Sequence, residues 1–193
     1  MKSKWVTKGI IGILLCTLML GIIGCQKKMD KEPIGDENAV PTVKTLQKEK
    51  WGVTAAKEDE NLNVEKMLTY AIENEYLEKA KYEAMIRKFG EIRPFIDLAK
   101  AKNINISILK TTFQKYKLSI PKDRSREFLK VPETIEESFE ISIADEIENM
   151  AMYNRFIRRK GVPQELILIL VRLRDASRAH LQSLEVGLKR VKE

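Results

Sequence analysis

The chain is poor in the residues that build metal, thiol and disulfide sites. Its 193 residues include one histidine, His180, and two cysteines, Cys16 and Cys25. One histidine excludes any site that needs several imidazoles. For reasons given next, neither cysteine is expected to remain as a free thiol in the folded domain, which excludes a disulfide scaffold, a multi-cysteine zinc site and a catalytic thiol. Glycine (9), proline (6) and aromatic residues (7%) are also scarce, while 44% of the chain is hydrophobic and 33% charged. This composition favours an all-helical domain with a buried core.

The first 25 residues have the pattern of a bacterial export signal. Three lysines in the first eight residues precede an uncharged run over 9–23, which is short for a membrane-spanning helix. The run ends in Leu-Gly-Ile-Ile-Gly-Cys over 20–25, which resembles a bacterial lipobox. The resemblance implies cleavage after Gly24 and acylation of Cys25. Two or three acyl chains would then anchor the protein stably to a membrane. The alternative is an uncleaved signal anchor with an incidental cysteine.

The residues that follow separate this export signal from the folded domain. No apolar period persists over 26–61, where prolines and glycines stand among mixed charges, so this segment is expected to be a flexible tether. The expected organisation is a signal over 1–24, the lipidated Cys25 with its tether over 25–61, and a domain over 62–193. We expect anchoring to a lipid bilayer at the outer face of the cytoplasmic membrane, or to an outer membrane where the cell has one.

The charge of the domain is modest. Residues 62–193 hold 25 basic and 20 acidic residues, a net charge of +5 against +7 for the whole chain. The only tight basic cluster is Arg158-Arg159-Lys160, at a helix end where cations suit the helix dipole. Nucleic acid is not an expected partner, because no aromatic residues are interleaved with a basic patch and the chain is expected to be exported.

The apolar period from residue 61 onward is helical. It predicts four helices of matched length, over about 62–89, 94–116, 133–160 and 163–193. The first and the last connections are tight, so each predicts an antiparallel hairpin. The middle connection, 117–132, is long enough to return along the whole bundle. One long crossover between two hairpins predicts an all-α, ferritin-like four-helix bundle.

Each helix has an inward stripe that is apolar except near its middle. On the first helix the stripe continues from Glu75 to Tyr82, and on the third from Glu146 to Met150. Polar residues at mid-height meet whichever way each helix runs. The sequence therefore predicts one polar layer in the core, made of Glu75, Lys102, Asn105, Glu146, Ser177 and His180.

Several short motifs resemble the ferritin-like superfamily, and most closely its members of the domain-of-unknown-function 2202 kind. The motifs are Glu75-Tyr76-Leu77 leading to Tyr82, Lys88-Phe89-Gly90, Arg93-Pro94-Phe95, Ala144-Asp145-Glu146-Ile147, Met152-Tyr153, and Ala176-Ser177 with His180-Leu181. The resemblance implies inward Glu residues on the first and third helices, and Glu-x-x-His or a variant on the second and fourth. In the superfamily these residues hold two metal ions.

The chain departs from that ligand pattern on the second helix. Where the relatives have Ala-Glu-x-x-His, residues 101–105 read Ala-Lys-Asn-Ile-Asn. Only Glu75, Glu146 and His180 match metal ligands, and Ser177 stands where a carboxylate could have been. Three ligands cannot hold two ions, so no metal is expected. We expect Lys102 to point inward and to pair with Glu75 and Glu146 in place of the metal charge. The alternative is that it turns outward to water.

Three functions are compatible with these features. The first is a membrane-anchored domain with a degenerate di-metal site, which serves as a non-catalytic binding or structural module without a cofactor. The second is a metalloprotein that keeps one iron, manganese or zinc ion on Glu75, Glu146 and His180, with oxidase- or peroxidase-type activity. The third is a helical adhesion or assembly module. The sequence names no protein partner and leaves oligomer formation open.

Overall fold

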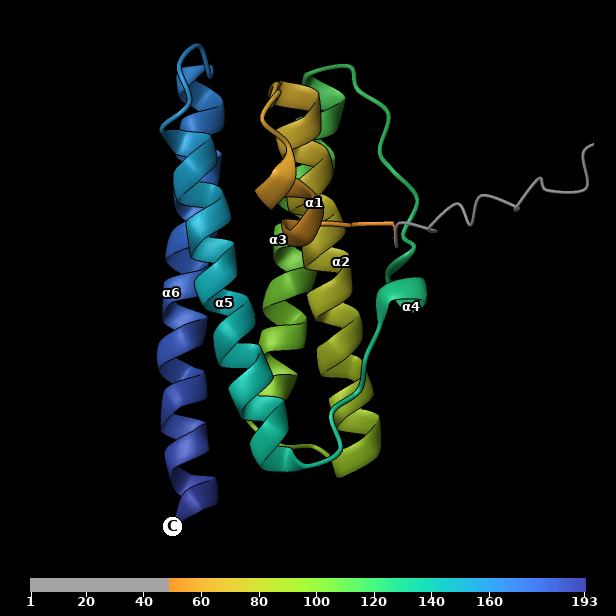
Figure 1. Ribbon diagram of the computed structural model, residues 1–193, viewed down its shortest axis with the longest axis vertical. Helices are drawn as coiled ribbons and strands as arrows, with labels where there is room; N and C mark the ends of the chain where they lie inside the picture. The colour runs from red at the N-terminus through yellow and green to blue at the C-terminus, as the bar shows by residue number, and fades with distance from the viewer. Residues whose placement is uncertain (1–48) are drawn as a thin grey trace, which may run out of the picture. The chain divides into compact units, whose positions relative to one another are not determined.

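The computed structural model describes residues 49–193. The expected signal, Cys25 and most of the expected tether lie outside the described residues. Within this part the chain is all-helical, which confirms the predicted fold class at that level (Figure 1). No helix within 49–193 combines the length and the apolar character needed to cross a membrane. The helices are α1 (Val53–Glu58), α2 (Val64–Phe89), α3 (Phe95–Lys115), α4 (Ser125–Phe128), α5 (Ile135–Ile157) and α6 (Gln164–Lys192).

The four long helices form two hairpins, α2 with α3 and α5 with α6 (Figure 1). Local signals set their ends. The side chain of Asn63 caps α2 by accepting a hydrogen bond from the backbone N–H of Lys66 at 2.9 Å. Gly90 ends the same helix with a φ of 92°, which is in the region that favours glycine. The Thr134 hydroxyl caps α5 by accepting from the N–H of Glu137 at 3.1 Å.

The connection between α3 and α5 runs along the outside of the bundle beside α2 (Figure 1). It includes the short helix α4, which contacts α2. Near the far end of α2, the Lys88 amine donates a hydrogen bond to the carbonyl oxygen of Pro132 at 2.7 Å. This path is the long return that the sequence predicted for residues 117–132.

The structure corrects the predicted boundary between tether and domain. Residues 49–61 belong to the same compact unit as the bundle. Trp51 is only 5% exposed, and its ring stacks on Phe128 of α4 with 5.1 Å between ring centroids. Gly52, with a φ of +57°, lies so close to α2 that a Cβ atom there would be 3.1 Å from the backbone of Asn74. This segment is too short to display an apolar period, so only its packing partners reveal that it is folded.

The core consists of two apolar clusters, one toward each end of the bundle. The first includes Leu68, Leu109, Tyr153 and Leu170. The second cluster contains Tyr82, Met85, Phe95, Leu98, Phe139 and Leu184. Each of the four long helices contributes to both clusters. The residues between them along each helix are polar, and they form the candidate site.

Candidate functional site

A layer of buried polar side chains separates the two apolar clusters. All four long helices contribute to it, and each member is less than one tenth exposed. We call this set the polar layer: Asn74, Glu75 and Glu78 from α2, Lys102 and Asn105 from α3, Glu146 and Asn149 from α5, and Ser177 and His180 from α6.

Lys102 is the centre of the polar layer. Its side chain is 0% exposed, so it does not turn outward to water. The Nζ atom lies 2.9 Å from Oε1 of Glu146 and 3.7 Å from Oε2 of Glu75, and it also contacts Oε2 of Glu78. These carboxylates come from α5 and α2, so one ammonium joins three helices and both hairpins.

Hydrogen bonds hold the Glu75 carboxylate in place. The Tyr153 hydroxyl donates to its Oε1 at 2.9 Å, and the side-chain amide of Asn105 donates to its Oε2 at 3.1 Å. Asn105 stands where the resemblance would place a histidine, and here it orients the carboxylate of Glu75. Tyr153 is thus a core aromatic residue whose hydroxyl is satisfied.

The Glu146 carboxylate contacts a different set of side chains. Nδ1 of His180 lies 3.1 Å from its Oε1. The Asn149 amide donates to its Oε2 at 3.3 Å, and the Tyr82 hydroxyl donates to Oε1 at 3.4 Å. Together with Lys102, these partners surround the carboxylate and replace the water that burial has removed.

Sequence reasoning missed Asn74, Glu78 and Asn149. The Asn149 amide donates to Glu78 as well as to Glu146, and it accepts a hydrogen bond from the Asn74 amide. On α5 the inward stripe steps three residues from Glu146 to Asn149, instead of four to Met150, which is only partly buried. Steps of three and of four residues both stay on one helix face, so spacing alone does not decide between Asn149 and Met150. The predicted stripe took the apolar Met150, which was wrong. A charged residue at 78 and an amide at 149 were the available signals.

The polar layer holds three carboxylates and one ammonium. Burial raises the pKa of Glu78 to about 8, because lost hydration and the neighbouring carboxylates outweigh the attraction of Lys102. Burial also opposes ionisation of Glu146, but Lys102 and His180 outweigh it and lower the pKa of Glu146 to about 2. Burial would lower the pKa of Lys102, yet the surrounding carboxylates raise it well above its ordinary value. At neutral pH, Glu78 therefore carries a proton while Glu146 and Lys102 are charged.

The contacts of Lys102 are electrostatic contacts rather than directed hydrogen bonds. Within residues 49–193, neither Nζ of Lys102 nor Oε2 of Glu78 has a hydrogen-bond partner at an acceptable angle. The 2.9 Å distance from Nζ to Oε1 of Glu146 nevertheless brings opposite charges together in a buried, low-dielectric setting. Charge attraction rather than hydrogen-bond geometry therefore holds the amine in place.

The polar layer as arranged does not fit a resident metal ion. The Lys102 ammonium occupies the space between the carboxylates that a cation would need. Nδ1 of His180 is engaged with Glu146. No group of three or more His, Cys, Asp or Glu side chains in the described part of the chain is placed to hold an ion. A metal could bind only after Lys102 had moved away.

Ser177 is the predicted member that takes least part in the cluster. It is buried on α6, one turn from His180. Within residues 49–193 its hydroxyl makes no hydrogen bond to the other members of the polar layer. The ion-pair cluster, which is Lys102 with Glu75, Glu78 and Glu146, therefore comes from α2, α3 and α5. His180 is the residue of α6 that contacts it.

Comparison of the chain with protein-family models, with curated proteins and with solved structures found no match. The resemblance to the ferritin-like superfamily therefore stays a prediction from the motifs.

Proposed function

We propose that this chain is a membrane-anchored ferritin-like domain in which an internal ion-pair cluster replaces the di-metal site. In this proposal the bundle is a non-catalytic binding or structural module at the outer face of a membrane. The observation that carries the proposal is the fully buried Lys102 ammonium, in contact with Glu78 and Glu146 and 3.7 Å from Glu75.

The cluster does the structural work that metal ions do in ferritin-like proteins. A cation is needed among buried carboxylates, because bare carboxylates repel one another and are costly to desolvate. Lys102 supplies that cation from within the chain. A buried ion pair adds little net stability, but it penalises any packing of the two hairpins that separates its charges.

Metal analysis tests the replacement. We expect the purified chain to carry no stoichiometric iron, manganese or zinc after growth with each metal. We expect the double variant Lys102→Glu with Asn105→His to gain metal affinity, because it restores a Glu-x-x-His spacing on the inner face of α3. The matched control is Lys100→Glu with Asn103→His, which makes the same changes at the same spacing on exposed positions of α3.

The outcomes separate the candidate functions. Stoichiometric metal in the unaltered chain that is lost in Glu146→Gln would overturn the replacement and favour the single-ion metalloprotein. Metal uptake by the exposed control, but not by the inner variant, would show that the polar layer cannot be converted into a ligand set.

Membrane anchoring is tested separately at Cys25. We expect the mature chain to begin at Cys25 and to carry fatty-acyl chains, as intact and peptide mass spectrometry would show. Cys25→Ala should abolish acylation and leave the signal uncleaved. Acyl chains on the Ala variant would contradict the proposed lipobox, without bearing on the core cluster.

A further inference from the structure

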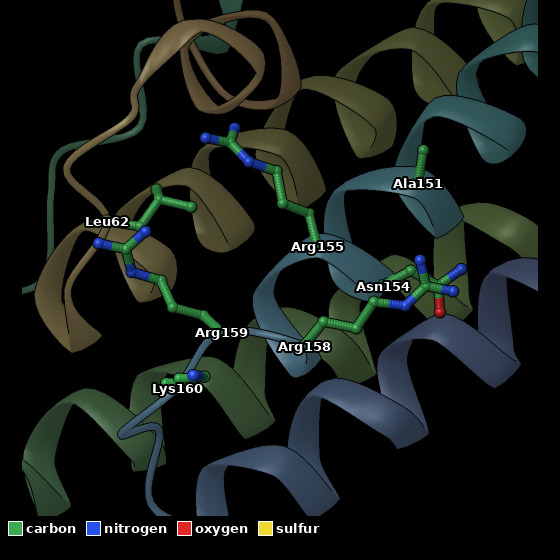
Figure 2. A pocket seen from close by; sticks show the side chains of 7 residues that line it. All are labelled: Leu62, Ala151, Asn154, Arg155, Arg158, Arg159 and Lys160. Atoms are coloured by element: carbon green, nitrogen blue, oxygen red, sulfur yellow. The ribbon is translucent and has the colours of Figure 1, made fainter.

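Four cations surround a hollow at the C-terminal end of α5. The hollow has a volume of about 740 Å³, and we call it the cationic hollow after Arg155, Arg158, Arg159 and Lys160, which line it (Figure 2). The remaining lining residues are Leu62, Ala151 and Asn154, so no acidic side chain is among them. The last three cations are exposed to solvent.

The charges of these four cations are uncompensated. None of them forms an ion pair with any of residues 49–193, although many other lysines and arginines of the domain do so, Lys88, Lys115 and Arg124 among them. The dipole of α5 favours cations at this end, but it does not account for the absence of acidic side chains from the lining of the hollow. The hollow is thus a local concentration of positive charge.

Two of these arginines also tie the start of the domain to α5. The Arg155 guanidinium donates to the carbonyl oxygens of Ala56 and Asp59, and Arg159 donates to that of Glu60 at 3.3 Å. The cationic hollow therefore lies against the segment between α1 and α2. This segment follows α1, near the start of the described residues.

The side chains do not converge on one point. Figure 2 shows the guanidinium groups of Arg155, Arg158 and Arg159 directed to different sides of the helix end. A single compact anion needs convergent donors, whereas a surface with many separate phosphates is matched by spread charges. Spread, exposed cations that form no ion pair within residues 49–193 are suited to such a surface.

We propose that the cationic hollow is a contact surface for the anionic phospholipid headgroups of the membrane to which the chain is anchored. This inference rests on the lipid anchoring proposed above. The 23 residues over 26–48 span at most about 80 Å, so an anchor at Cys25 keeps the domain within reach of the bilayer. The hollow then sets which end of the bundle faces the lipid.

The test uses the compact unit 49–193 without the anchor, together with sedimentation of vesicles. The vesicles contain either phosphatidylcholine alone or phosphatidylcholine with 30 mol% phosphatidylglycerol, a composition chosen to be roughly that of a moderately anionic membrane. We expect binding only to the anionic vesicles and loss of that binding in high salt. Arg158→Gln with Lys160→Gln should weaken the partition on the order of tenfold or more, because each cation near an anionic surface contributes severalfold.

A control variant removes the same charge elsewhere. Arg126→Gln with Lys130→Gln changes two exposed cations of the α3–α5 connection that form no ion pair within residues 49–193. This variant should bind anionic vesicles within about twofold of the unaltered domain. Circular dichroism and thermal melting of each variant establish that it is folded.

Several results would overturn the proposal. Equal binding to both vesicle types would show that the contact is not electrostatic, and equal losses in both variants would show an effect of net charge alone. Tight binding of inorganic phosphate that requires Arg158, without vesicle binding, would indicate a site for a free anion instead. Because this test does not use the acyl anchor, its failure is distinguishable from failure of the anchoring at Cys25.

Discussion

Replacement of Lys102 by methionine is the most direct perturbation of the polar layer. Methionine keeps most of the length and the apolar stem of the lysine but removes its charge. The variant leaves the buried carboxyl groups of Glu75, Glu78 and Glu146 without the ammonium that contacts or faces them. Removal of one partner from a buried ion pair costs about 3–5 kcal/mol, because the remaining charge stays buried and uncompensated. We expect a loss of this size at pH 7.

The pH dependence of this loss identifies its cause. Without Lys102 the carboxylates can escape their repulsion only by taking up protons, which is easier at pH 5 than at pH 7. The deficit of Lys102→Met relative to the unaltered chain should therefore shrink at the lower pH. Adding Glu146→Gln to Lys102→Met should restore part of the stability at pH 7, since one of the unpaired carboxylates is then neutral.

Urea denaturation followed by circular dichroism measures these free energies. A loss of 3–5 kcal/mol corresponds to a fall in melting temperature of roughly 10 °C or more for a domain of this size. Lys100→Met, on the exposed face of the same helix, is the matched control and should change the free energy by less than about 0.5 kcal/mol. The reasoning is refuted if Lys102→Met is as stable as this control at pH 7, or if its deficit is the same at both pH values.

Three further predictions follow from the packing and the charges. The pKa of Glu78 is raised to about 8 from the ordinary 4.5, so between these pH values the folded chain holds a proton that the unfolded chain has lost. The free energy of unfolding should therefore fall as pH rises from about 4.5 to 8, by up to roughly 1.4 kcal/mol per pH unit. Urea titrations of Glu78→Gln should show a flatter dependence of this free energy on pH. Gly187→Ala should destabilise by about 1–3 kcal/mol, because the new Cβ atom would lie 2.8 Å from Cζ of the buried Phe139; thermal melting should show partial recovery with Phe139→Leu. Trp51→Ala should lower the free energy of unfolding by about 3 kcal/mol, since its ring is buried against Phe128, whereas an unpacked tether would give no change in the same titration.

Much of the helical architecture could be predicted from local signals in the sequence. The apolar period at spacings of three and four predicted the four long helices, and the structure places the ends of α2 at a capping asparagine, Asn63, and at a glycine, Gly90. The lengths of the connections predicted two hairpins and a long return path. These features are local because a cap or a turn needs only its own neighbours in the chain.

The sequence by itself also placed polar residues at mid-height on all four helices, but only the tertiary structure decided which of them meet. Glu78 lies three residues after Glu75, and Asn149 lies three residues after Glu146, but steps of three and of four residues both keep to the inward face of a helix. Which side chain enters the core depends on the packing of the partner helices, which the spacing along one helix does not contain. The same holds for Trp51, whose burial depends on Phe128, 77 residues further along the chain. Local patterns therefore determine the helices, whereas contacts between distant segments determine the membership of the core and of the polar layer.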